Sequence, residues 1–96
     1  MKTLVIKDIF KQDYITREAG EELRTLILEN YNNKQETTLD FSDIIIASTS
    51  FFDEGIAKLA LEGWDKKTYN KFIIIKDINR MDMEVLNKML KYRKLI

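Results

Sequence analysis

The sequence contains no cysteine, no histidine and no proline, and only three of its 96 residues are glycine. Without cysteine the chain has no disulfide and no thiolate nucleophile, and without histidine it has no imidazole base and no zinc site of the usual kind. Gly20, Gly55 and Gly63 are isolated, so no glycine-rich loop can cradle a phosphate. These absences exclude most familiar hydrolytic sites, and we expect a non-catalytic protein that needs no metal or cofactor.

The charges balance, with 16 basic and 16 acidic side chains. A balanced chain has no overall field that would hold nucleic acid or a membrane surface, so we expect neither as a partner. Charged residues interrupt the first twenty positions, and no apolar run approaches the roughly 20 residues of a membrane-spanning helix. We therefore expect a cytoplasmic protein with neither signal peptide nor membrane span, and with a single domain over residues 1–96.

The most informative stretch of the sequence runs from residue 37 to residue 59. A β-favouring run, Thr37–Phe41, is followed after Ser42-Asp43 by a second apolar run, Ile44–Ala47. Three hydroxyl residues come next: Ser48, Thr49 and Ser50. The pattern predicts a buried strand region that leads through a polar turn to a helix.

That helix is expected to begin at Ser50. Asp53 lies three residues after Ser50, a spacing typical of a capping box, and Gly63 is a natural helix end. The large apolar residues that follow recur at helical spacing: Phe52, Ile56 and Leu59. The pattern predicts one helix from Ser50 to about Glu62.

The rest of the chain continues an alternation of strand and helix patterns. The predicted strands are Thr3–Ile6, with Ile9-Phe10 as an optional extension, and Lys71–Lys76, whose continuous β-branched run is typical of a strand covered on both faces. The predicted helices run from Thr16 to about Asn32 and from Asn79 to the basic end of the chain, while Trp64–Asn70 is expected to be a polar connection. This order predicts an α/β fold with a short mixed or parallel sheet of three to five strands and about three helices.

The hydroxyl residues at positions 48–50 allow two interpretations. The simpler one is that the Ser50 hydroxyl caps the helix, which contributes on the order of 1 kcal/mol. The functional one is that Ser50, Thr49 or Ser48 accepts a phosphoryl group or contacts an anion, because a helix N-terminus favours negative charge. One hydroxyl can do both, although the nearby carboxylates of Asp43, Asp53 and Glu54 would repel a phosphate.

Several side chains around this turn are candidates for contact with a partner protein. They are Asp43, Phe51, Asp53, Glu54 and Trp64. Together with Asp40, the acidic members match no calcium loop, so turn formation and capping explain them better than metal binding or catalysis. Trp64 can serve as an exposed anchor or fold onto the core.

Three short motifs occur in an order typical of one family. They are Thr-Arg-x-x-Gly at residues 16–20, Leu-Asp-Phe at residues 39–41 and Ser-Phe-x-x-Glu at residues 50–54. In these motifs the chain resembles STAS domains, the fold of sulfate-transporter tails and anti-sigma-factor antagonists, and more closely a bacterial STAS-like family of unknown function. The resemblance covers nearly the whole chain and implies a small α/β domain.

The resemblance also implies a function. In the antagonists, a serine in an Asp-Ser-Ser/Thr-Gly-Leu setting opens the helix after this strand and is regulated by a partner kinase. Ser50 falls at that position with Thr49 before it, while Ser48 stands in place of the aspartate and Phe51 in place of the glycine. The implied function is a regulatory interaction module that docks through residues 48–59, for example on a GHKL-type ATPase or kinase, and is switched by phosphorylation.

The residues leave a different class of function open as well. The same helix N-terminus can bind a small ligand such as a nucleotide or another anion, because it presents unpaired N–H groups and a partial positive charge. The oligomeric state does not follow from the sequence.

Overall fold

Three short parallel strands form the sheet at the centre of the structure. The computed structural model describes residues 2–11 and 15–96 and contains β1 (Lys2–Val5), β2 (Thr37–Asp40) and β3 (Ile73–Lys76), in the order β1-β2-β3. In register, Leu4 of β1 lies beside Leu39 of β2, which lies beside Ile75 of β3. Leu39 is fully buried, so the middle strand belongs to the core.

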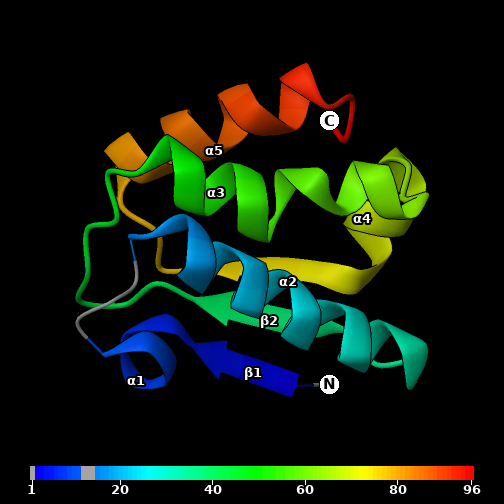
Figure 1. Cartoon of the computed structure of the whole chain (residues 1–96), viewed down its shortest axis with the longest axis horizontal. Helices are drawn as coiled ribbons and strands as arrows, with labels where there is room; N and C mark the ends of the chain where they lie inside the picture. Colours follow the sequence, from blue (N-terminus) through cyan, green and yellow to red (C-terminus); the bar gives the residue numbers. More distant parts are fainter. Residues whose placement is uncertain (1, 12–14) are drawn as a thin grey trace.

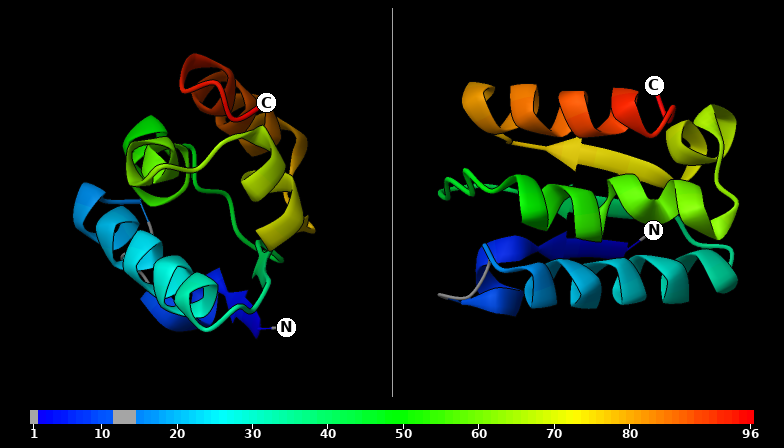
Figure 2. Two further views of the ribbon diagram at one scale, coloured as in Figure 1. Left: turned by 90° about the vertical axis from the view of Figure 1, so that its right-hand side faces the viewer. Right: turned by 45° about the horizontal axis from the view of Figure 1, so that its top comes forward.

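The longer helices cover one face of this sheet. The helical elements are α1 (Ile6–Phe10), α2 (Arg17–Asn32), α3 (Thr49–Gly55), a 3-10 helix η1 (Ala57–Glu62), α4 (Lys66–Phe72) and α5 (Arg80–Tyr92). Figure 1 and the left view of Figure 2 show α2, α3 and α5 on the same side of the strands. Parallel strands joined in sequential order by right-handed crossovers place successive helices on one side, which accounts for this arrangement.

The opposite face of the sheet is more open. Thr3, Thr38 and Ile74 lie side by side in register there, and the Ile74 side chain is 41% exposed. The expectation that the third strand is covered on both faces is therefore wrong. Thr38 is nevertheless buried, because neighbouring strands flank the central strand on both sides.

Side-chain caps fix the ends of the helices that the sequence predicted best. The Thr16 hydroxyl accepts a hydrogen bond from the backbone N–H of Ala19 at 3.1 Å, and the Asn79 side chain accepts one from Asp82 N–H at 2.9 Å. Gly63 ends η1 with φ of 86°, in the left-handed region that favours glycine. Both caps and the glycine stop are confirmed.

Four predicted elements are wrong in type or extent. Ile9-Phe10 belong to α1 rather than to a strand, and Ile44–Ala47 form no regular element. The connection predicted at Trp64–Asn70 contains the start of α4, which begins at the Asp65 cap and delays β3 until Ile73. The helix predicted from Ser50 to Glu62 is divided into α3 and η1.

A buried carboxylate holds the Ile44–Ala47 segment in place of a strand partner. Asp82 is 0% exposed, and its side chain accepts hydrogen bonds from Ile46 N–H at 2.7 Å and Ala47 N–H at 2.8 Å. The Asn79 side-chain amide donates to the same carboxylate at 2.7 Å. A side chain of α5 therefore satisfies backbone donors that a fourth strand would otherwise pair.

Two glycines allow α2 and α3 to approach closely. A Cβ atom built on Gly20 would lie 2.8 Å from Glu54 Cβ and 3.0 Å from the Phe51 carbonyl oxygen, and one on Gly55 would lie 3.0 Å from Leu23 Cδ2. No side chain larger than hydrogen fits at Gly20 without moving α3. The two glycines within helices thus mark the place where α2 and α3 are in close contact.

We expect Asp82→Ala to lower the free energy of unfolding by about 2–4 kcal/mol, because the buried N–H of Ile46 and the part-buried N–H of Ala47 lose their acceptor. Urea denaturation followed by circular dichroism measures the change. Glu84→Ala, two residues further on the exposed side of α5, serves as the control and should stay within about 0.5 kcal/mol of the wild type. Equal effects of the two variants would contradict the role assigned to Asp82.

We expect Gly20→Ala to destabilise the fold by about 1–3 kcal/mol, because the added methyl group has no space between α2 and α3. Helix propensity alone predicts the opposite sign, a gain of up to about 1 kcal/mol. Thermal and urea unfolding of this variant beside Glu22→Ala, at an exposed position of α2, separates the two effects. A Gly20→Ala protein more stable than the wild type would show that the helices are not in tight contact.

Candidate docking corner at the start of helix α3

The three hydroxyl residues Ser48, Thr49 and Ser50, here called the corner, lie where the chain enters α3. Ser48 is the N-cap: its hydroxyl accepts a hydrogen bond from Phe51 N–H at 3.2 Å and donates one to the Ile15 carbonyl oxygen at 2.7 Å. The prediction that Ser50 caps the helix is therefore wrong by two residues. The helix begins earlier because Ser48 has the extended backbone that a cap requires, with φ of −133° and ψ of 111°.

Since Ser48 caps the helix, the hydroxyl groups of Thr49 and Ser50 are not needed as caps. Thr49 is exposed, and Ser50 is half-buried beside α2. Arg17 Nη2 of α2 donates a hydrogen bond to Ser50 Oγ at 3.4 Å. The structure thus places a guanidinium group next to Ser50, which the sequence did not predict.

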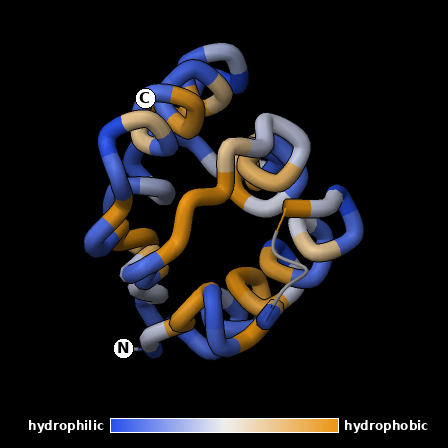
Figure 3. Tube along the Cα trace, turned by 90° about the vertical axis from the view of Figure 1, so that its left-hand side faces the viewer, coloured by the Kyte–Doolittle hydropathy of each residue, from blue (hydrophilic) through white to orange (hydrophobic). Residues whose placement is uncertain are grey.

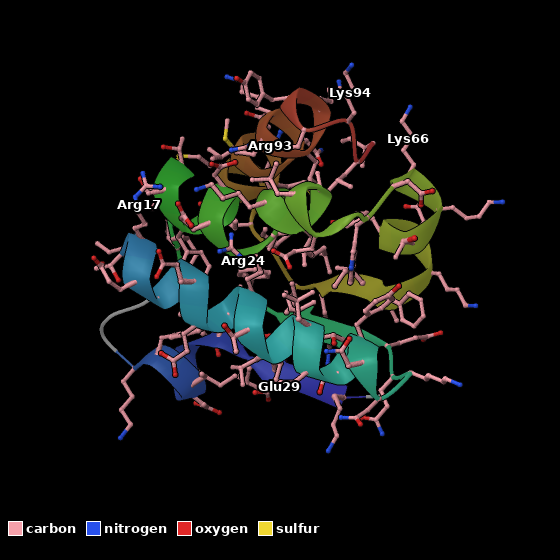
Figure 4. All side chains as sticks on the ribbon, turned by 45° about the vertical axis from the view of Figure 1, so that its right-hand side comes forward. Arg17, Arg24, Glu29, Lys66, Arg93 and Lys94 are labelled. Atoms are coloured by element: carbon pink, nitrogen blue, oxygen red, sulfur yellow. The ribbon has the colours of Figure 1, made fainter. Side chains whose placement is uncertain are left out.

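Glu54, four residues after Ser50, is buried between α2 and α3 and is surrounded by cations. Its carboxylate forms ion pairs with Arg17, Arg24 and Lys58, and Arg24 Nη1 also donates to the Glu54 carbonyl oxygen at 2.8 Å. Figure 4 shows Arg17 and Arg24 projecting from α2 toward α3. Burial would raise the pKa of Glu54, but hydrogen bonds from Lys58 and Arg17 outweigh it and hold that pKa below its usual value.

A second ion pair joins α3 to the end of α5. Arg93 Nε and Nη2 each donate to one oxygen of the Asp53 carboxylate at 3.1 Å, and the Arg93 side chain is seen between the two helices in Figure 4. These hydrogen bonds raise the pKa of Arg93. Such a two-pronged pair fixes the orientation of both groups, and it replaces the capping-box role predicted for Asp53.

Three of the predicted partner-contact residues are buried inside the molecule. Phe51 is 0% exposed, Glu54 is 3% exposed and Trp64 is 5% exposed. The Trp64 ring packs against Tyr31, with ring centroids 4.9 Å apart, so it belongs to the core side of α2. The expectation that these three side chains contact a partner directly is wrong, because none of them reaches the surface.

The remaining acidic candidates lie apart from the corner. Asp43 is exposed in the turn after β2, where Lys7 Nζ lies 3.1 Å from its carboxylate. Asp40 accepts hydrogen bonds from the hydroxyl and the backbone N–H of Ser42, which lower the pKa of Asp40. Within residues 2–11 and 15–96, no group of three or more acidic, histidine or cysteine side chains could hold a metal ion.

The sequence prediction missed the two arginines of α2. In the sequence, Arg17 and Arg24 fall among the charged positions of an amphipathic helix, which usually face solvent. Their spacing from Gly20 could have revealed their position. Arg17 lies three residues before this closely packed glycine and Arg24 four residues after it, so both share its face of the helix. A charged side chain on a closely packed face needs an opposite charge in the facing helix, and Glu54 supplies it.

No helix in the described part of the chain is long and apolar enough to cross a membrane.

We expect Glu54→Gln to lower the free energy of unfolding at pH 7 by about 1–3 kcal/mol, because three cations lose their counter-charge. A depressed pKa means that the ionised carboxylate stabilises the fold above its unfolded pKa, near 4.5, and that this contribution is lost as the pH falls through the lower folded pKa. The difference between wild type and Glu54→Gln should therefore shrink below about pH 4.5. Urea titrations from pH 7 to pH 3 measure it, with Glu29→Gln on the exposed side of α2 as the control.

Comparison with known families identifies the chain over most of its length. Residues 19–83 match the family described as a STAS-like domain of unknown function, DUF4325, and include β2, α3, η1, α4 and β3. Comparisons with curated proteins and with solved structures gave no match. The match covers more than half of the chain and agrees with the small α/β fold, so the chain belongs to this STAS-like family.

Proposed function

We propose that this STAS-like domain is a non-catalytic regulatory module that docks on another protein through the corner and the exposed side of α3. The partner class that the family resemblance favours is a GHKL-type ATPase or kinase. The observation that carries the proposal is the corner itself: three consecutive hydroxyl residues at the surface, one of them in contact with an arginine.

The surroundings of the corner support a contact surface. Exposed apolar side chains flank it, since Ile15 is 50% exposed and Ile45 is 60% exposed. Ile15 also contacts the corner directly, because its carbonyl oxygen accepts a hydrogen bond from the Ser48 hydroxyl. Exposed isoleucines next to polar hydroxyls offer a partner both apolar area and hydrogen bonds.

The surroundings of Ser50 support a phosphorylation switch. A phosphoryl group on Ser50 would place strong hydrogen-bond acceptors next to the guanidinium group of Arg17, whose side chain is 53% exposed. Arg17 also serves Glu54, so the phosphate would compete with that carboxylate for the same guanidinium group. Because Ser48 supplies the cap, modification of Ser50 leaves the helix start intact.

The acidic residues near the corner support a non-catalytic role. Glu54 and Asp53 are each engaged by cations, and the lowered pKa of Glu54 keeps that carboxylate ionised rather than ready to exchange a proton near neutral pH. The ligand-binding alternative gains no such support, because the Ser48 hydroxyl already accepts a first-turn N–H group of a helix only seven residues long.

We expect Ser50→Asp to change the affinity for the partner at least about tenfold while the melting temperature stays within about 3 °C of the wild type. The measurement is isothermal titration calorimetry with purified GHKL-type ATPase domains from the same genome, each in its ATP-analogue and ADP forms. Thr25→Asp is the matched control, because it adds the same charge at an exposed position of α2.

Two further results decide between parts of the proposal. Ser48→Ala should lose about 1 kcal/mol of stability because the cap is removed, yet retain the response to Ser50→Asp. If no GHKL-type domain binds the wild-type protein, the proposed partner class is wrong. Binding that Ser50→Asp leaves unchanged would remove the switch.

A further inference from the structure

A groove opens at the end of the sheet where β2 and β3 finish. It is a shallow, open groove of about 660 Å³ between the turn after β2 and the segment after β3. Its apolar lining consists of Phe41, Ile44, Ile45 and Ile78, and its polar lining of Asp43, Asp77 and Asn79. In Figure 3, which views this end of the molecule, the apolar run 44–46 forms the orange segment across the centre.

Hydrogen bonds within the molecule hold the apolar wall of the groove in a fixed conformation. Asp82 fixes Ile46 and Ala47 through their N–H groups, and the Asn79 side-chain amide donates to the Ile44 carbonyl oxygen at 3.4 Å. With both neighbours anchored, Ile45 points away from the core and stays 60% exposed. A fixed, exposed isoleucine can gain apolar burial on binding without a large ordering cost.

The charges at the rim of the groove are negative. Asp43 retains 79% exposure of its side chain although Lys7 pairs with it, and an exposed pair of this kind adds little stability and exchanges readily. Asp77 is exposed and its carboxylate lies 3.1 Å from the Ser42 hydroxyl oxygen, whose proton is shared with Asp40, and Asp77 has no ion pair among the residues that the structure describes. Among the residues that the structure describes, no lysine or arginine is part of the lining, although Lys7 reaches Asp43 at the rim.

We infer that this groove receives a short segment of the partner protein in which a large aliphatic side chain is flanked by lysine or arginine. The aliphatic side chain would pack on Ile44, Ile45 and Ile78, and the flanking cations would meet Asp43 and Asp77. This inference rests on the proposed function, since Ile45 lies three residues before the corner, and it names the chemistry of the docking segment.

The test uses the full chain, labelled with ¹⁵N, and two synthetic peptides capped at both ends. One peptide is Lys-Lys-Leu-Leu-Lys-Lys, and the other is Glu-Glu-Leu-Leu-Glu-Glu. The first should shift the amide signals of residues 42–46 and 77–79 and bind at least about tenfold more tightly than the second. Its affinity should fall as the salt concentration rises, because rim charges are screened.

Matched variants separate the groove from the rest of the surface. Ile45→Ser and the double variant Asp43→Asn/Asp77→Asn should each weaken the cationic peptide at least about fivefold. Leu61→Ser and Glu62→Gln are the controls, because Leu61 is 66% exposed and Glu62 is exposed on η1, outside the groove. Neither control should alter the affinity for the cationic peptide. The amide spectrum of each variant, if it is that of a folded protein, shows that a loss of affinity is not caused by unfolding.

Three outcomes would overturn the inference. Shifts spread over all acidic surfaces would mean non-specific attraction, and equal binding of both peptides would remove the charge recognition. Shifts of the groove signals on concentrating the protein alone would assign the groove to a second copy of the chain. If the peptide fails while an ATPase domain still responds to Ser50→Asp, the groove is wrong and the proposed function stands.

Discussion

The close approach of α2 and α3 is the constraint on which the rest of the structure depends. Gly20 and Gly55 remove the side chains that would keep the two helices apart, and Glu54 is thereby buried against α2. A buried carboxylate is tolerated only with compensating charge, so Arg17, Arg24 and Lys58 gather around it. The same contact brings Arg17 next to Ser50, so the packing of two helices determines the chemistry of the corner.

A second set of polar contacts replaces the strand that the sheet lacks. The Ile44–Ala47 run has the composition of a strand, yet it joins none of the three strands of the sheet. The Asp82 carboxylate accepts hydrogen bonds from two of its N–H groups and ties the run to α5. Ile44 and Ile45 of this run line the groove, and the corner follows the run directly.

The sequence predicted those parts of the fold whose signals are local. Thr16, Asn79 and Gly63 mark helix ends by side-chain capping or left-handed backbone, and the structure confirms all three. It failed where a distant residue decides, as at Ile44–Ala47, whose conformation depends on Asp82. It also missed α4, because only Tyr69 and Phe72 give that helix an apolar side, although Asp65 with Thr68 is a recognisable cap. At the candidate site the sequence located the corner, but burial of Phe51, Glu54 and Trp64 follows from packing that no single segment encodes.

The parallel direction of the strands has a practical consequence for attaching this molecule to a surface or a label. All three strands finish at the corner and groove, while β1 begins and α5 ends toward the opposite side (Figure 1). A tag, fluorophore or neighbouring domain attached at either end would therefore sit behind the recognition surface. Immobilised by either terminus on a biosensor, the molecule would face the solution with its hydroxyl residues unobstructed.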